Sequence, residues 1–98
     1  MFARARTLSD LDLSNNALGT TVPAFLGELA ALDGLHLWNC GLTGPLPESL
    51  GRLGKLTALD FASNGLQGAV PSSITGLRNL ELLALQFNNL SGALPSLP

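Results

Sequence analysis

The stretch LTALDFASNGLQGAVPSSITGLRN, residues Leu56–Asn79, carries the pattern that decides the fold. Its skeleton recurs before and after it, and each copy continues as LxxLx[LF]xx[NC]xL. The copies open at a constant spacing, on Leu8, Leu32, Leu56 and Leu80. Single-domain globular folds do not produce such a period by chance. The pattern therefore predicts a repeat array, in which each unit packs only on its neighbours.

The period divides the chain into units. We predict a single array over residues 1–98, with units at 8–31, 32–55 and 56–79 and a truncated unit at 80–98. Residues 1–7 are interpreted as the end of a degenerate preceding unit, because Phe2 and Ala5 fall where Leu26 and Leu29 fall in the next unit. Such arrays normally have polar capping sequences, and none is visible at either end of this one. Their absence suggests a fragment, an assembly or edges that associate, with a tolerated small array as the alternative, and we expect the isolated chain to self-associate or fray at its ends.

Each unit is predicted to begin with a short strand. Its first, fourth and sixth residues are apolar, and the alternation at the fourth and sixth is typical of a strand whose intervening residues point outward. The strand centres fall at Asp10 to Asp12, Gly34 to His36, Ala58 to Asp60 and Leu82 to Ala84. Stacked side by side, they predict one narrow parallel sheet.

The second half of each unit is predicted to be a bend and a brief helix. Single glycines at 44, 68 and 92 indicate positive φ or close backbone approach, and unit one departs by placing Gly19 one position early. A Val-Pro or Leu-Pro pair then fits an extended residue that leads into the first turn of a helix. Apolar residues three apart, such as Leu50 and Leu53, fit one or two α or 3₁₀ turns facing the core.

The ninth position of each unit is predicted to be a structural ladder. It holds Asn16, Cys40, Asn64 and Asn88, where the chain turns inward and leaves backbone groups that need buried partners. An amide side chain supplies both donors and acceptors for this purpose. Cys40 is interpreted as an inert stand-in that supplies a weak thiol donor, in preference to a reactive thiol.

Composition excludes several classes of partner. Apolar residues make up 46% of the chain, charged residues 12%, and the net charge is −2, so no basic field exists for nucleic acid or an anionic membrane. The apolar runs are far shorter than the roughly 20 residues of a membrane span. The single cysteine excludes an internal disulfide framework and a cysteine-rich zinc site. No apolar segment follows the two arginines near Met1, so this start lacks the pattern of a secretory signal.

The full pattern LxxLxLxxNxLxGxIPxxLxxLxx, over Leu8 to Pro98, resembles the plant-type leucine-rich repeat. The segment NNLSGALP, from Asn88 to Pro95, matches it almost letter for letter. The resemblance implies an α/β fold, a right-handed horseshoe solenoid with a short parallel sheet on its concave face and short α or 3₁₀ helices on its convex face. It also implies binding of proteins or peptides, as in the ectodomains of receptor-like kinases and receptor-like proteins and in polygalacturonase-inhibiting proteins.

The same resemblance suggests an extracellular or cell-surface location. The chain departs from many extracellular members in lacking their cysteine-containing caps. Asn89-Leu90-Ser91 is a candidate glycosylation acceptor, although the same letters belong to the repeat consensus.

The only histidine, His36, is predicted to lie between Asp12 and Asp60 in one column of neighbouring strands. A metal cluster there is disfavoured because the two acids are two strands apart, about 9 to 10 Å at the backbone, and a solvated trio is the better interpretation. Ser14, His36 and Asp60 could also be drawn as a nucleophile, base and orienting acid. An open sheet offers no oxyanion donors and no cleft that excludes water, so we expect no catalytic residues, no metal and no cofactor.

Charges sort by their place in the unit. The strand positions hold five acids, and the helical arm holds five bases, Arg4, Arg6, Arg52, Lys55 and Arg78, with only Glu28 and Glu48 crossing over. Outward apolar residues would add a modest patch. We predict that the concave face binds a protein or peptide with a basic segment. The residues assigned to this face are Asp10, Asp12, Asp33, His36, Trp38, Asp60, Leu82 and Phe87, with Glu81 as the fifth acid.

Two other functions are weighed against this one. A flat repetitive face could bind ice or a polysaccharide, but the second position of the unit holds Ser9, Asp33, Thr57 and Glu81, which vary too much to match a lattice. An enzyme is the third and least favoured function.

Overall fold

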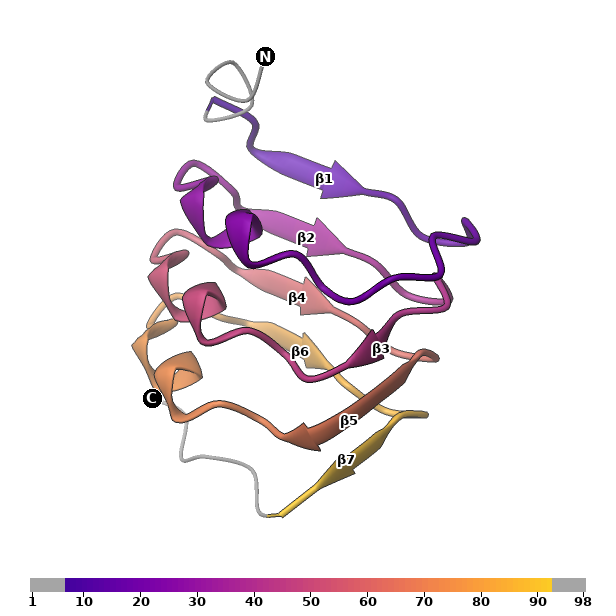
Figure 1. Cartoon of the computed structure of the whole chain (residues 1–98). Helices are drawn as coiled ribbons and strands as arrows, with labels where there is room; N and C mark the ends of the chain where they lie inside the picture. Colours follow the sequence, from indigo (N-terminus) through magenta and orange to yellow (C-terminus); the bar gives the residue numbers. More distant parts are fainter. Residues whose placement is uncertain (1–6, 93–98) are drawn as a thin grey trace.

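The computed structural model of the chain describes residues 7–92. Figure 1 shows the units stacked in sequence order, with the strands on one side and short helices on the other. The parallel strands and the short 3₁₀ helices agree with the predicted solenoid architecture. The predicted end of a preceding unit lies outside the described residues, apart from Thr7.

The first sheet was predicted to the residue. Its strands are β1 (Asp10–Asp12), β2 (Gly34–His36), β4 (Ala58–Asp60) and β6 (Leu82–Ala84), in the order β1-β2-β4-β6. All pairs are parallel, and partners hold equivalent positions in successive units, as do Leu11 and Leu35. The period in the sequence is therefore the register of the sheet, because each unit repeats the backbone path of the unit before it.

The prediction of a single sheet was wrong. A second parallel sheet consists of β3 (Thr43–Gly44), β5 (Gly65–Ala69) and β7 (Asn89–Ser91), and an isolated bridge from Thr21 to Thr43 continues it toward unit one. Partners in this sheet lie closer in sequence than one full period, as do Gln67 and Asn89. Within one unit, the sequence of these strands resembles a turn. Only their hydrogen bonds to neighbouring units make them strands.

Three 3₁₀ helices form the returning arm: η1 (Ala24–Glu28), η2 (Glu48–Arg52) and η3 (Ser72–Gly76). The prolines before them are extended, with ψ between 133° and 143°. They therefore precede the helices and do not form their first turns, which corrects the prediction from the sequence. The helices lie close together. A Cβ on Gly27 or Gly51 would fall against the carbonyl group of Ser49 or Ser73 in the next helix.

The core is a continuous leucine stack between the first sheet and the helices. Leu35, Leu50, Leu53 and Leu59 are fully buried, and Phe61 replaces leucine at the sixth position of its unit without any exposure. The predicted apolar helix edges also face this core. Gly44, Gly68 and Gly92 have positive φ as predicted, and in unit one Gly19 takes this conformation one position early.

The asparagine ladder lies at the inward turn as predicted. Asn64 Oδ1 accepts hydrogen bonds from the backbone N–H groups of Cys40 (2.9 Å) and Leu42 (3.0 Å), while Nδ2 donates to the carbonyl oxygens of Leu37 and Phe61 (both 2.9 Å). Asn88 repeats the arrangement one unit later, and Asn16 donates to Leu13.

Cys40 fills the same place with a thiol. It is fully buried, and its Sγ donates to the carbonyl oxygens of Leu13 (3.2 Å) and Trp38 (3.5 Å). The side chain thus keeps the donor half of the amide and lacks the acceptor half.

A candidate protein-binding face

The outward residues of the first sheet form a surface that we call the strand face: Asp10, Asp12, Gly34, His36, Trp38, Ala58, Asp60, Ala62, Leu82 and Ala84. The register brings Asp12, His36 and Asp60 side by side, as the sequence predicts. Asp10, Gly34, Ala58 and Leu82 form the neighbouring column. The face thus has an acidic part over units one to three and an apolar part toward unit four.

Two of the acids also hold the ends of their strands. Asp12 Oδ1 accepts a hydrogen bond from the Ser14 N–H (3.0 Å), and Asp60 Oδ1 accepts one from the Ala62 N–H (3.1 Å). Hydrogen bonds from the Ser14 backbone and side chain lower the pKa of Asp12, and the nearby His36 adds a smaller effect in the same direction. Both carboxylates are therefore fixed in position, Asp12 exposed to solvent and Asp60 half-buried.

His36 pairs across the columns. Its Nε2 lies 3.6 Å from Asp10 Oδ1, with 26% of the histidine side chain and 66% of the aspartate side chain exposed. Gly34 makes this approach possible, because a Cβ at this position would fall against Asp10 Oδ1 and within 3.0 Å of His36 Nε2. Gly34 is a site residue that sequence reasoning missed. A glycine among outward strand residues was its only signal.

Asp33 lies at the edge of this group, just before β2. The Thr57 hydroxyl donates to Asp33 Oδ1 and also contacts the Asp33 carbonyl oxygen at 3.2 Å. Asp33 therefore has a hydrogen-bond partner within the array, although it is exposed, as is Glu81 at the same position before β6. Asp10, Asp12 and Glu81 are exposed as well, and Asp60 is half-buried.

The apolar residues predicted to point outward are exposed: Trp38 by 38%, Leu82 by 48% and Phe87 by 78%. Phe87 has φ of 60°, in a column of positive φ with Asn15, Asn39 and Ser63. Asparagine tolerates this conformation, whereas a bulky aromatic residue rarely adopts it. Sequence reasoning placed Phe87 outward and did not foresee its strained backbone.

Small side chains lie between Trp38 and Leu82. Ala62 and Ala84 are each 8% exposed, and Ala58, the register partner of Leu82, is half-buried. Trp38 and Leu82 thus lie on opposite sides of a patch of three alanines that has Asp60 at its centre. Sequence reasoning missed these alanines, because an outward alanine carries no chemical signal until its neighbours are known.

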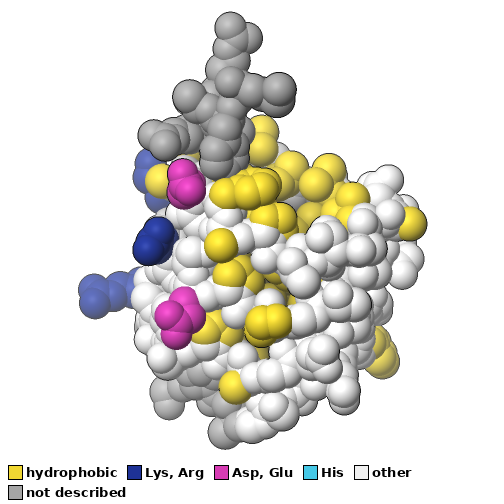
Figure 2. Space-filling model, viewed as in Figure 1, with side chains coloured by type: hydrophobic (Ala, Val, Ile, Leu, Met, Phe, Trp, Pro, Cys, Tyr) yellow, Lys and Arg dark blue, Asp and Glu magenta, His cyan; other side chains and the backbone are white. Residues whose placement is uncertain are grey.

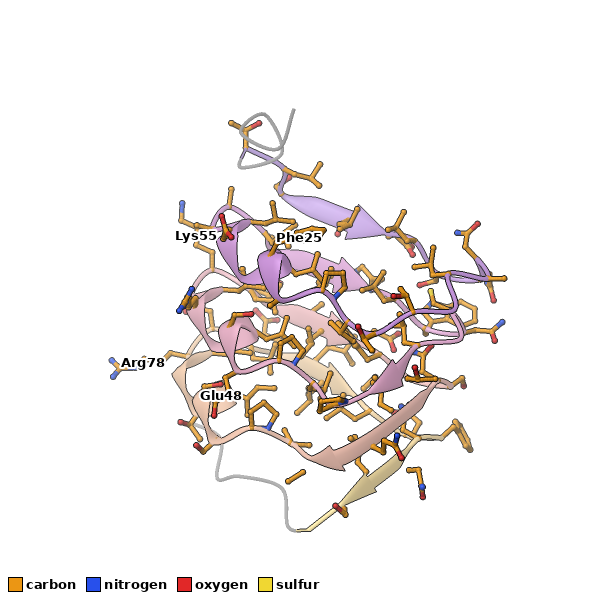
Figure 3. All side chains as sticks on the ribbon, in the orientation of Figure 1. Phe25, Glu48, Lys55 and Arg78 are labelled. Atoms are coloured by element: carbon orange, nitrogen blue, oxygen red, sulfur yellow. The ribbon has the colours of Figure 1, made fainter. Side chains whose placement is uncertain are left out.

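The basic residues lie on the other side of the molecule. Figure 3 shows Lys55 and Arg78 extending from the side of the 3₁₀ helices, where Glu48 also lies, and Arg52 ends η2. Arg4 and Arg6 lie outside the described residues. Within residues 7–92, the strand positions therefore hold five acids and no lysine or arginine.

The other candidate features carry no chemistry of their own here. Over residues 7–92, no three His, Cys, Asp or Glu side chains gather as a metal-binding group. Asn89 lies exposed in β7, in the second sheet. None of the described helices is both long and apolar enough to cross a membrane.

Known protein families match the sequence of this chain. The leucine rich repeat family matches residues 30–90, and a second leucine rich repeat match covers residues 7–29. No curated protein sequence matches the chain.

Several solved structures are similar. The Arabidopsis receptor kinase HAESA, solved with the peptide hormone IDA and the co-receptor SERK1, is 43% identical over 92% of this chain and 15% of its own, with a TM-score of 0.88. The receptor in the PEPR1–AtPEP1 structure is 38% identical over 93% of this chain and 13% of its own, with a TM-score of 0.90. A plant ice-binding protein is 36% identical over 85% of this chain and 27% of its own, with a TM-score of 0.76.

The chain thus spans about a seventh of the two receptors that it resembles. The family match covers most of the residues, and the fold, the unit-to-unit register and the asparagine ladder agree with it. The chain belongs to the leucine-rich-repeat family.

Proposed function

We propose that the chain is a protein- or peptide-binding module without catalytic activity, and that its ligand lies across the strand face, taken as the concave face of the solenoid. The similar receptors support this class of function, since HAESA was solved with a peptide hormone and a co-receptor. One observation carries the assignment: a single face combines two fixed carboxylates, the exposed Asp12 and the half-buried Asp60, with alanines that surround Asp60 between Trp38 and Leu82.

The ligand is an extended segment with a basic and an apolar part. Its basic residues lie near Asp10, Asp12 and Asp60, and its apolar side chains pack on Trp38, Leu82 and the alanines beside Asp60. Exposed acids mainly steer association, whereas an aromatic anchor that becomes buried slows dissociation. Asp33, engaged by Thr57, contributes least among the acids assigned to the face.

The test uses peptides selected from a random library on the immobilised protein. Asp→Asn changes at 12 and 60 remove the charge and keep the Oδ1 acceptor that holds each strand end. We expect this double variant to bind the selected basic peptides with slower association and a weaker salt dependence. We expect Trp38→Ala to speed dissociation instead.

Arg52→Gln with Arg78→Gln is the matched control on the helical side. It changes two charges, as the aspartate variant does, and leaves the strand face intact. If the control loses the selected peptides while the aspartate and Trp38 variants keep them, the ligand lies on the other side of the array.

Ice binding is a second candidate, because a plant ice-binding protein is among the similar structures. The surface of this chain favours ice binding less than peptide binding. The column of Asn15 and Asn39, joined by a hydrogen bond of 2.8 Å, is interrupted by Ser63 and Phe87. In the second sheet the shorter register displaces equivalent residues from one unit to the next, so they do not line up in columns. Thermal hysteresis measured on the purified protein would decide between the two functions.

A further inference from the structure

Asp60 lies at the centre of the strand face, in unit three, with a described unit on each side of it. The register places His36 and Ala84 beside it on the neighbouring strands. Ala58 and Ala62 are the outward residues before and after it along its own chain segment. Three of the four side chains that adjoin the carboxylate are therefore alanines, which have no group to pair with it.

Trp38 is an outward residue of unit two, and backbone hydrogen bonds keep this part of the unit in register with unit three. The Leu37 N–H donates to the Asp60 carbonyl oxygen at 2.8 Å, and the Asn39 N–H donates to the Ala62 carbonyl oxygen at 3.0 Å. Trp38 therefore lies diagonal to Asp60, one strand across and two residues along, which separates their Cα atoms by about 8 Å. An aromatic side chain can reach across a diagonal of this length.

Asp60 differs from the other acids of the strand positions in its partners. Three of those acids have a side-chain partner: Asp10 has His36, Asp12 has Ser14 and Asp33 has Thr57. Asp60 Oδ1 accepts only the Ala62 N–H, and within residues 7–92 no side chain forms a hydrogen bond or an ion pair with the carboxylate. Glu81, the fifth acid, is exposed to water, whereas Asp60 is half-buried. Among the described acids of the strand positions, Asp60 alone is partly withdrawn from water without a side-chain partner.

A half-buried carboxylate is a favourable partner for a cation. Burial removes part of its hydration, and an ion pair that is partly buried is screened by salt much less than an exposed pair. The basic residues of the described chain lie elsewhere, because Figure 2 shows the lysine and arginine side chains along the edge of the molecule where the 3₁₀ helices lie. A cation that pairs with Asp60 would therefore come from a ligand.

Trp38 favours one kind of cation. Its side chain is 38% exposed, and its backbone is held on the side of unit one, where its N–H donates to Ser14 Oγ at 3.2 Å and its carbonyl oxygen accepts from the Asn15 N–H at 3.0 Å. An anchored aromatic side chain thus lies beside the unpaired carboxylate. A guanidinium group stacks on aromatic rings, binds carboxylates through two parallel N–H groups and is more weakly hydrated than an ammonium group. Arginine therefore fits this pair of residues better than lysine.

We propose that Asp60 and Trp38 form a subsite for an arginine side chain of the bound segment, with the guanidinium group paired to the Asp60 carboxylate and lying against the Trp38 ring. The inference rests on the proposed function, since it assigns a ligand group to the same face. It also divides the work among the acids. Asp10 and Asp12, which have partners within the array and are exposed, attract the basic segment, whereas Asp60 binds one residue of it.

Peptides selected from a random library on the wild-type chain provide the probes, and each arginine in them is replaced in turn by lysine and by citrulline. Lysine keeps the charge without the planar group, and citrulline keeps the planar shape without the charge. We expect one arginine whose replacement by either residue weakens binding roughly tenfold. The peptides that contain this arginine should also shift the NMR signal of the Trp38 indole N–H, which is unique because the chain has one tryptophan.

Three variants, each checked for folding by circular dichroism, assign the arginine to its subsite. Asp60→Asn removes the charge and keeps the acceptor for the Ala62 N–H, and its preference for arginine over citrulline should fall to less than about twofold, as expected for two groups in direct contact. Asp12→Asn is the matched control, because it makes the same change in the same row of the strand face. It should weaken the arginine and lysine peptides alike and keep the preference for arginine. Trp38→Leu should reduce the preference for arginine over lysine.

Two results would overturn the inference and leave the proposed function standing. Selected peptides could depend on Trp38 and yet tolerate lysine or citrulline at every arginine, or the preference for arginine could survive Asp60→Asn and disappear in Asp12→Asn. A third result would overturn both, namely that no selected peptide is weakened by any change on the strand face.

Discussion

At the scale of single residues, Asn64 supports the turn between two units more than any other polar side chain described. Replacing it with alanine leaves the N–H groups of Cys40 and Leu42 and the carbonyl of Leu37 without this partner, while the Phe61 carbonyl keeps its hydrogen bond from Asn88. Asn64 is half-buried, so water can reach part of this turn after the substitution, and a buried group left unsatisfied costs about 1 to 3 kcal/mol. We expect Asn64→Ala to lower the free energy of unfolding by about 1 to 3 kcal/mol, measured by urea denaturation.

Two cysteine-related variants serve as controls for that measurement. Asn64→Cys keeps a donor and loses the acceptor, as at Cys40, so its loss should fall between those of the wild type and Asn64→Ala. Cys40→Asn restores the acceptor and should be neutral or stabilising. A neutral Asn64→Ala would mean that water can replace the amide at this turn.

Asp12 gives the fold a defined dependence on pH. Its pKa is lowered below the ordinary value of 3.8, so the folded state binds its proton less readily than the unfolded state does. The resulting stabilisation is present above the unfolded pKa and is lost as pH falls through the folded pKa. Asp12→Asn keeps the acceptor for Ser14 and does not titrate.

We therefore expect the stability difference between wild type and Asp12→Asn to be constant near neutral pH and to shrink below about pH 4. Urea unfolding at several pH values measures it, and an NMR titration of the Asp12 carboxyl follows the same group directly. A difference that stays constant down to about pH 2 would contradict the role of the Ser14 hydrogen bonds.

At the scale of secondary-structure elements, close stacking of the 3₁₀ helices depends on glycine. The Ser73 hydroxyl donates to the Glu48 carbonyl oxygen at 2.7 Å and draws η3 onto η2, and a Cβ on Gly51 would collide with the Ser73 backbone. We expect Gly51→Ala to destabilise the fold by about 1 to 3 kcal/mol through overpacking. Thermal or urea unfolding would measure this.

Gly54 is the matched control, three residues further along the same arm. A Cβ there meets no atom within 4 Å, so Gly54→Ala should change stability by less than about 0.5 kcal/mol. Equal losses for the two variants would show that the loss at Gly51 does not come from contact with the next helix.

The elements that sequence could predict are those whose signal lies within one unit. The apolar spacing located β1, β2, β4 and β6 to the residue, and residues three apart located the short helices. The second sheet was missed because its strands are very short and pair across units at a different offset. No local pattern records such a pairing.

The candidate site was likewise predicted only in part from the sequence. Register arguments placed Asp12, His36 and Asp60 side by side, because equivalent positions stack. They could not show that His36 turns toward Asp10, or that Gly34 leaves room for this contact. The alanines around Asp60 and the strained Phe87 also depend on which neighbours surround a position, and a single unit does not contain that information.

At the scale of the whole molecule, the burial of the core leucines decreases toward both ends of the array. The leucines of units two and three are almost fully buried, whereas Leu8, Leu13 and Leu18 of unit one are exposed and the core leucines of unit four are only partly buried. In a repeat array each unit is stabilised mainly by its nearest neighbours, so a terminal unit has only one supporting interface. Its local opening should therefore require less free energy than that of a central unit.

Three chemically equivalent amides make this gradient measurable. The N–H groups of Leu13, Leu37 and Phe61 donate to the carbonyl oxygen of the following unit at 2.9, 2.8 and 2.8 Å, so their hydrogen bonds are alike and only their units differ. We expect hydrogen exchange in dilute protein to be fastest at Leu13 and slower at Leu37 and Phe61. Equal protection at all three would mean that the array unfolds as a single cooperative unit, despite the exposed leucines at its N-terminal end.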